Sequence, residues 1–305
     1  MIRASNLSRY YGKRPGVTDI HFTIQENQIV GLLGPNGAGK STIMKMLAGY
    51  QLPTAGTIEI DGRDILEVLD QHLMCVGFLP ENPPLYPEME AEELLLFTAS
   101  VKGIQKAERA EHVQKIMELT QITHVKDRLV KNLSKGYRQR VGLAQALIGL
   151  PKIIILDEPT VGMDPAQICE VRRLLEQLKK DHTIIVSSHI LAEIAEICDW
   201  IIVINKGRLV LEESMDELRH GKMDDDRFIL RTTAGTEALE RCLADVEGIG
   251  SITETQDGLY LVQADDSDEL RSRVAAAMVG AGLPVLEMKR SGHSLEEIFL
   301  KLTAD

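Results

Sequence analysis

The sequence lacks the basic charge and the long apolar runs that define two large classes of protein. Acidic residues outnumber basic ones, and the formal net charge is −12. Nucleic-acid-binding proteins usually present a basic face instead. The longest apolar stretches, such as residues 153–156, are far shorter than the roughly 18 residues that a membrane span needs. We therefore expect no nucleic-acid partner and no membrane-spanning helix.

Signals for secretion, disulfide pairing and internal repetition are also missing. Residues 1–6 lack the apolar core of a signal peptide. Cys75, Cys169, Cys198 and Cys242 have no paired spacing, which favours buried reduced thiols over disulfides or a metal site. No fixed period indicates a solenoid. We expect a soluble, cytosolic protein.

The pattern of apolar residues predicts a large α/β domain in the first 220 residues. Up to about residue 80, short β-type runs alternate with turns, including a hairpin around residues 57–60. Residues 88–150 have helical spacing, which predicts a helical subdomain. After Pro151 we expect a strand at 153–156, a helix at 164–180, a strand at 183–186 and a helix near 191–197. This alternation indicates a largely parallel sheet with helices on both faces.

A second, smaller domain is predicted for residues 227–305, after a charged linker at 221–226. The expected order is β-α-β-β-α-β followed by a last helix, which is the signature of a ferredoxin-like α+β fold. The expected elements are strand 227–232, helix 237–243, strands 251–254 and 258–262, helix 268–279, strand 285–289 and helix 294–302. This domain has no cluster of titratable side chains, so a dimer-stabilising or regulatory appendage is favoured over a small-molecule sensor.

Residues 34–42 form a complete Gly-x-x-x-x-Gly-Lys-Ser phosphate loop between an apolar strand at 29–33 and a helix at 42–48 that stops at Gly49. Glycines allow backbone N–H groups to surround an anion, the helix N-terminus adds partial positive charge, and a lysine adds a full charge. The sequence therefore predicts a nucleoside triphosphate site. Its residues are Gly34, Pro35, Asn36, Gly37, Ala38, Gly39, Lys40, Ser41 and Thr42.

A second strong signal is the acidic pair that follows the apolar run at 153–156. Asp157 is expected at the carboxyl end of a buried strand, where open α/β sheets bind their ligands. There its carboxylate can reach Mg²⁺, for which Ser41 supplies a hydroxyl oxygen. Glu158 can act as the general base for an attacking water. The alternative is an acidic pair that merely closes a strand.

The chain resembles the ATP-binding-cassette (ABC) ATPases over residues 1 to about 215, because further motifs of that family occur in the same order. Tyr11 matches the aromatic residue that stacks on adenine, although adjacent Tyr10 leaves an ambiguity of one residue. His189 matches the switch histidine that contacts the γ-phosphate. The signature motif corresponds to Leu133, Ser134, Lys135, Gly136 and Tyr137 and runs into a predicted helix start at Arg138, and the loop after the catalytic glutamate corresponds to Gly162, Met163 and Asp164.

Two departures from the family pattern resemble the branch of ABC-2 type exporters, which includes drug-resistance and gliding-motility ATPases. Lys135 and Tyr137 replace the common glycine and glutamine of the signature, while Ser134 and Gly136 are kept. Glu81 stands where the family usually has a glutamine that touches Mg²⁺ and senses the membrane partner. Residues 84–89 and 294–303 also resemble that branch.

The resemblance implies an ATPase subunit that binds ATP and Mg²⁺ in a head-to-tail dimer of cassettes. Ser41, Asp157 and Glu81 would hold the metal, and Ser134 and Gly136 would cap the γ-phosphate held by the partner chain. The second cassette, in a homodimer or a heterodimer, and the membrane permease would be separate chains. The subunit would lie peripherally on the cytoplasmic face of the membrane. The alternatives are a soluble ABC ATPase that acts on ribosomes or DNA and an importer ATPase.

Overall fold

The computed structural model describes residues 1–220, 227–256, 258–264 and 267–290. These residues divide into two compact units, 1–216 and 217–290. The predicted linker at 221–226 and the predicted last helix at 294–302 lie outside the described residues.

The first unit contains an antiparallel sheet built from the N-terminal region. Its order is β2-β1-β4-β5, formed by β1 (Ile2–Tyr11), β2 (Arg14–Ile24), β4 (Ala55–Ile60) and β5 (Arg63–Asp64). The predicted hairpin is the β4–β5 pair, which turns at Asp61 and Gly62, both with positive φ. The inner residues of this sheet, such as Leu7 and Ile20, are fully buried in one core.

A six-stranded sheet forms the centre of the same unit, with all neighbouring strands parallel except β9 and β10. Every residue of β3, β7 and β8 is buried, as expected for strands with both faces covered. The predicted parallel sheet is therefore confirmed. Its order is β10-β9-β3-β8-β7-β6, formed by β3 (Ile29–Leu33), β6 (Val76–Leu79), β7 (Ile153–Leu156), β8 (Thr183–Ser188), β9 (Trp200–Asn205) and β10 (Arg208–Ser214).

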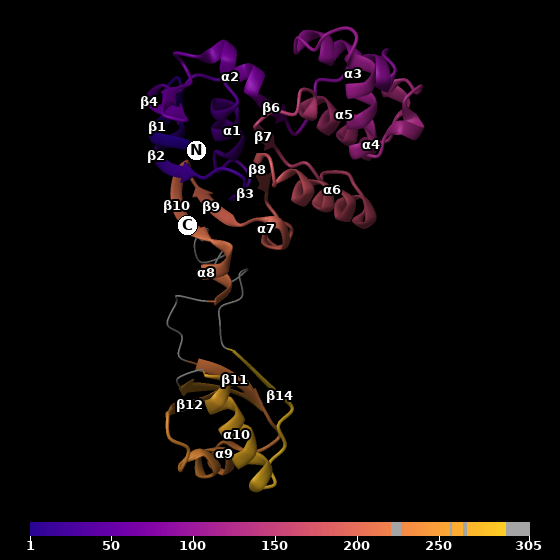
Figure 1. The fold of residues 1–305 in the computed structure, drawn as a ribbon. Helices are drawn as coiled ribbons and strands as arrows, with labels where there is room; N and C mark the ends of the chain where they lie inside the picture. Colours follow the sequence, from indigo (N-terminus) through magenta and orange to yellow (C-terminus); the bar gives the residue numbers. More distant parts are fainter. Residues whose placement is uncertain (221–226, 257, 265–266, 291–305) are drawn as a thin grey trace. The chain divides into compact units, whose positions relative to one another are not determined.

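Helices α3, α4 and α5 gather to one side of this sheet, beyond β6 and β7 (Figure 1). The helices of the unit are α1 (Lys40–Leu47), α2 (Leu69–Cys75), α3 (Ala91–Val101), α4 (Arg109–Leu119), α5 (Lys135–Leu147), α6 (Pro165–Leu178) and α7 (Leu191–Ile197), and α8 (Met215–His220) crosses the boundary to the second unit. Helix α1 begins two residues earlier than predicted. Helix α5 begins at Lys135 rather than Arg138, because Ser134 is its N-cap.

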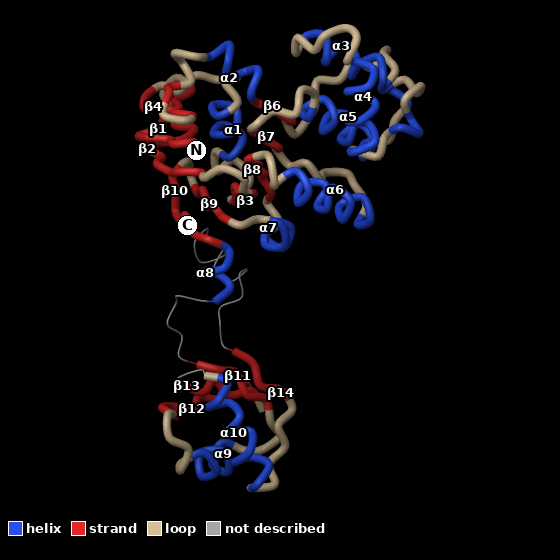
Figure 2. The backbone as a smooth tube through the Cα atoms, viewed as in Figure 1, coloured by secondary structure: helices blue, strands red, loops and turns tan. Residues whose placement is uncertain are grey.

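The second unit has the predicted β-α-β-β-α-β order and its own hydrophobic core, which includes Phe228 and Tyr260. Helices α9 and α10 lie beside a four-stranded antiparallel sheet of order β12-β13-β11-β14 (Figure 2). Its elements are β11 (Arg227–Arg231), α9 (Thr236–Leu243), β12 (Ile249–Gln256), β13 (Leu259–Ala264), α10 (Asp268–Gly280) and β14 (Glu287–Arg290).

The structure tests the expected burial of the cysteine thiols and the expected absence of a membrane-spanning helix. All four cysteines are free, but only Cys198 is buried, whereas Cys75 and Cys169 are exposed and Cys242 is half-buried. The prediction of buried thiols is therefore wrong for Cys75 and Cys169, which occupy outward positions at the end of α2 and on α6. Among the described residues, no helix is both long and apolar enough to cross a membrane.

Candidate functional site

A cavity of about 590 Å³ brings together most of the residues that the motifs predict. It lies where β1, the phosphate loop, the loop after β6 and the carboxyl ends of β7 and β8 meet. Tyr11 lines the cavity, whereas Tyr10 does not. The lining residues are Tyr11, Pro15, Gly16, Asn36, Gly37, Ala38, Gly39, Lys40, Ser41, Thr42, Glu81, Asp157, Glu158, Val161 and His189.

The phosphate loop follows β3 and leads directly into α1. Gly39 is the N-cap of α1 with φ 112°, a backbone conformation that L side chains rarely adopt. A Cβ at Gly39 would lie 2.6 Å from Val17 Cγ1, and one at Gly34 would lie 2.2 Å from the carbonyl oxygen of Ile204. Both positions therefore require glycine. No acidic residue occupies the first turn of α1, so no carboxylate of the helix itself offsets the partial positive charge of its N-terminus.

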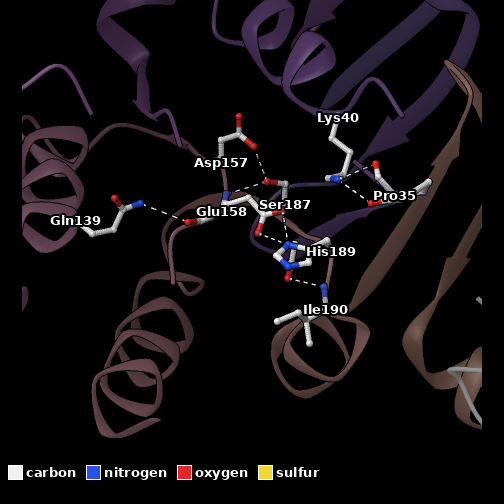
Figure 3. A network of polar contacts seen from close by, with 10 residues as sticks. Pro35, Lys40, Gln139, Asp157, Glu158, Ser187, His189 and Ile190 are labelled. Atoms are coloured by element: carbon white, nitrogen blue, oxygen red, sulfur yellow. Dashed lines mark hydrogen bonds and ion pairs between the residues drawn. The ribbon is translucent and has the colours of Figure 1, made fainter. Parts of the chain in front are cut away.

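Lys40 crosses the loop from the first turn of α1 and is only 6% exposed. Its Nζ donates to the carbonyl oxygens of Gly34 at 2.7 Å and Pro35 at 3.3 Å (Figure 3). Burial lowers the pKa of Lys40, while the charges of Glu158, Asp157 and Glu81 act to raise it. Gly34 and Pro35 thus contribute by holding Lys40 rather than by lining the cavity.

Ser187, at the end of β8, links the two acidic residues at the end of β7. Its hydroxyl donates to Asp157 Oδ1 at 2.7 Å and accepts the backbone N–H of Glu158 at 2.9 Å (Figure 3). The parallel pairing of Leu156 with Val186 places these residues side by side. The family motifs predict no separate role for Ser187. The sequence feature that could have indicated this role is the pair of serines, Ser187 and Ser188, that ends the apolar run of β8.

Glu158 and His189 contact each other, and both line the cavity. His189 Nδ1 lies 3.1 Å from Glu158 Oε1 and 3.0 Å from Oε2 (Figure 3). Burial raises the pKa of Glu158, and its hydrogen bond to His189 partly opposes that shift. A carboxylate with a raised pKa beside a histidine is suited to accept a proton from water.

Gln139 of α5 also contacts this region, and sequence analysis did not identify it. It is 3% exposed, and its Nε2 donates to the backbone oxygen of Glu158 at 3.4 Å. The side chain reaches Glu158 from another part of the chain, so no local pattern indicates the contact.

The signature residues do not line the cavity. Ser134 caps α5, where its hydroxyl accepts the N–H of Tyr137 at 3.3 Å, and Leu133 is buried beside it. The Tyr137 hydroxyl lies 2.8 Å from His124 Nε2, and the two rings meet edge to face. The serine hydroxyl and the N-terminus of α5 therefore form a second region suited to an anion, apart from the first.

The loop after Glu158 packs against the signature residues of the same chain. A Cβ at Gly162, which has φ 81°, would lie 2.6 Å from Lys135 Cδ, and one at Gly136 would lie 2.7 Å from Gln167 Oε1. Glycine at both positions permits this close approach. Met163 is half-buried in the loop, and Asp164 ends it as the N-cap of α6, with Oδ1 accepting the N–H of Gln167 at 2.9 Å.

Comparisons with known proteins agree with this arrangement. The family model described as ABC transporter matches residues 17–161. The bacitracin transport ATP-binding protein BcrA of Bacillus licheniformis is 34% identical over 304 residues, which cover 99% of this chain and 97% of that protein. The lantibiotic transport ATP-binding protein SrtF of Streptococcus pyogenes is 37% identical over 217 residues, covering 71% of this chain and 92% of that protein.

Solved structures match about seven tenths of the chain. An ATP-binding subunit of an ABC transporter has a TM-score of 0.66 and 29% identity, and the match covers 72% of this chain and 92% of that one. A dimeric bacterial ABC transporter cassette also has a TM-score of 0.66, with 25% identity over 70% of this chain and 99% of that one. The chain therefore belongs to the ATP-binding proteins of ABC transporters, a family of ATPases.

Proposed function

We propose that this chain hydrolyses MgATP as one half of a head-to-tail cassette dimer and so drives an ABC-2 type exporter. The observation that carries the proposal is the single cavity in which the phosphate loop and Lys40 lie beside Asp157, Glu158 and His189. Binding of a triphosphate, placement of a metal and activation of water all require groups that this cavity contains.

The nucleotide would lie along the cavity from Tyr11 to Glu158. Adenine would stack on Tyr11, the backbone N–H groups of residues 36–42 would surround the β- and γ-phosphates, and the Lys40 ammonium would neutralise them. In this arrangement the Lys40 Nζ would exchange its carbonyl partners for phosphate oxygens.

Magnesium fits the oxygen donors of this cavity. Ser41, Asp157 and Glu81 all line it. The described part of the chain contains no group of three or more His, Cys, Asp or Glu residues that could hold a metal. Mg²⁺ usually takes one or two protein carboxylates and completes its shell with substrate phosphates and waters. These three residues would hold the ion, which neutralises phosphate charge when bound.

Water attack depends on Glu158 and on the groups that hold it. The carboxylate takes a proton from the attacking water, which requires the deprotonated form. Ser187 and Gln139 fix the backbone of Glu158, and His189 orients its carboxylate. His189 is 48% exposed at its side chain, so it can also turn toward the γ-phosphate.

The signature residues would complete the site of a second cassette. Ser134 and Gly136 lie outside the cavity of their own chain, at a separate helix N-terminus. A head-to-tail pair would place this N-terminus over the partner's γ-phosphate and bury each ATP between two chains. The match to a bacterial cassette described as dimeric supports this arrangement.

A surface near Glu81 supports a contact with a separate permease. Residues 82–89 contain three prolines, which fix backbone angles. Tyr86 is 52% exposed and meets Phe97 edge to face at 5.9 Å. A groove of about 510 Å³, lined by apolar residues that include Phe78, Pro83 and Val101, lies beside this segment. Exposed apolar side chains next to a groove suit a short helix from a partner.

Export is the direction that the relatives favour. Those matched over most of this chain include proteins named for bacitracin transport and for linearmycin resistance. A permease contact would hold this subunit on the cytoplasmic face of the membrane. The β-α-β-β-α-β unit would stabilise the dimer or regulate it.

The Glu158→Gln variant tests the proposal. It keeps the size of the side chain but removes the base, so turnover should fall by about 10²-fold or more while ATP still binds. The matched control is Glu176→Gln, the same change at an exposed position of α6 outside the cavity. Near-normal hydrolysis by Glu158→Gln would exclude the assigned base.

A further inference from the structure

Tyr11 is held in three ways, at its hydroxyl, at one face of its ring and at one edge of its ring. Its hydroxyl lies 3.0 Å from the side-chain amide of Gln51 and 3.3 Å from Thr42 Oγ1. The Arg9 guanidinium lies over the ring, with Cζ 5.3 Å from the ring centroid. A Cβ at Gly16 would lie 2.7 Å from Tyr11 Cε2, so the glycine leaves the space that the ring edge occupies. The ring is therefore fixed although Tyr11 is 49% exposed.

The amide of Gln51 connects the other two side chains. In the orientation that satisfies both partners, its oxygen accepts from Arg9 Nε at 2.7 Å and its nitrogen donates to the Tyr11 hydroxyl at 3.0 Å. Arg9 Nη1 also donates to the carbonyl oxygen of Leu52 at 2.9 Å. Arg9 and Gln51 thus hold each other, and together they hold Tyr11.

Arg9 and Gln51 hold the ring from outside the cavity. Tyr11 lines the cavity, whereas Arg9 and Gln51 do not. The Arg9 guanidinium and the Gln51 amide therefore contact Tyr11 without occupying the space that a nucleobase would fill. An aromatic ring that is held in its binding orientation before the ligand arrives loses less conformational entropy on binding.

We propose that Arg9 and Gln51 are positioning residues that fix Tyr11 for the nucleobase. The affinity for the base then depends on both residues, whereas the affinity for the phosphate chain does not. This inference rests on the proposed stacking of adenine on Tyr11.

The test measures the Kd of ATP and of inorganic tripolyphosphate, with equal Mg²⁺, for the full chain and its variants. Tyr11→Phe and Gln51→Leu should each raise the Kd of ATP by about three- to tenfold, the effect of one hydrogen bond. Their double variant should add little to the larger single effect, because both changes break the same bond. Arg9→Met should raise the Kd of ATP by about two- to fivefold. Tripolyphosphate binding should stay unchanged throughout.

Two further variants, Tyr11→Ala and Arg3→Met, distinguish a wrong positioning role for Arg9 and Gln51 from a wrong base contact at Tyr11. Tyr11→Ala removes the stacking ring and should weaken ATP about tenfold or more without affecting tripolyphosphate. If Tyr11→Ala binds ATP normally, the base contact itself is wrong. If Tyr11→Ala weakens ATP but Gln51→Leu and Arg9→Met do not, only the positioning role is overturned. Equal losses for ATP and tripolyphosphate would also overturn it. Arg3→Met, at the far end of β1, is the control and should match the wild type.

Discussion

Replacement of Ser187 by alanine should damage both stability and catalysis, because one buried hydroxyl serves both acidic residues of the site. Ser187 has no exposed surface. It donates to Asp157 at 2.7 Å and accepts the Glu158 N–H at 2.9 Å. Ser187→Ala removes both bonds and leaves a buried N–H and a buried carboxylate oxygen without this partner.

The expected loss of stability follows from these two bonds. A hydrogen bond to a charged group contributes about 1.5–3 kcal/mol, and a buried donor left unsatisfied costs about 1–3 kcal/mol. The two losses occur at one site and do not simply add. We therefore expect the free energy of unfolding of the first unit to fall by about 2–4 kcal/mol. The urea midpoint of that unit should decrease accordingly.

The catalytic effect arises from the backbone of Glu158. This residue has φ 51°, in the left-handed region that a glutamate rarely adopts, and the Ser187 hydroxyl holds its N–H there. Without that bond the carboxylate is no longer fixed against the water. A displacement of about 1 Å can cost about 10²-fold in rate. We expect kcat to fall by about 10- to 100-fold, while ATP binding changes little because the phosphate loop is intact.

The assay must separate this effect from unfolding. Hydrolysis is measured at saturating ATP and low temperature, where circular dichroism shows the variant to be folded. Thr183→Val is the matched control, since it removes a hydroxyl from the same strand whose partner is the distant N–H of Asn27. That variant should lose stability without losing kcat. A folded Ser187→Ala protein with a kcat within about twofold of wild type would refute the reasoning.

Three other predictions concern the base, the dimer and the permease. Burial raises the pKa of Glu158 above the ordinary 4.5. Because only the deprotonated carboxylate can accept a proton, activity should be lost as the pH falls through that raised pKa. A kcat/KM profile whose acid limb is centred at or below pH 4.5 would contradict this prediction. Ser134→Arg should leave ATP binding by the monomer intact but prevent the ATP-dependent dimer in size-exclusion chromatography, and loss of monomer binding would rule out the cross-chain placement. Leu85→Ala combined with Tyr86→Ala should keep basal hydrolysis near normal. The same double variant should reduce co-purification with the permease and abolish export. Export at the wild-type level would show that the permease contact lies elsewhere.

Short-range patterns were sufficient for the phosphate loop and for the strand before Asp157. Each is encoded by residues that are adjacent in the chain, and the loop conformation needs glycines that the sequence displays. The start of α5 was predicted too late for a local reason. Gly136 has low helix propensity, and Tyr137 stands where a capping box would have Glu or Gln. Residues 134–137 therefore lack the pattern that predicts the first turn of a helix.

Residues brought together by tertiary structure could not be predicted in the same way. Ser187 meets Asp157 only because β7 and β8 pair in one register, and Gln139 meets Glu158 only because α5 packs beside that loop. The exposure of Cys75 and Cys169 likewise depends on which helix faces are covered. The sequence indicated which chemical groups are present, whereas their distances were set by strand pairing and helix packing.

Helix α5 carries a residue for each of the two sites that the proposed dimer would contain. Ser134 at its N-terminus would reach the nucleotide of the partner, and Gln139, within two turns of the same helix, donates to the backbone of Glu158 in its own chain. A helix that turns as a rigid body cannot move one of these residues without moving the other. If Ser134 approaches the partner's γ-phosphate as proposed, the same movement changes the position of Gln139 relative to Glu158. Closure over one ATP would therefore alter the alignment of the base at the other, which couples the two sites through a single helix.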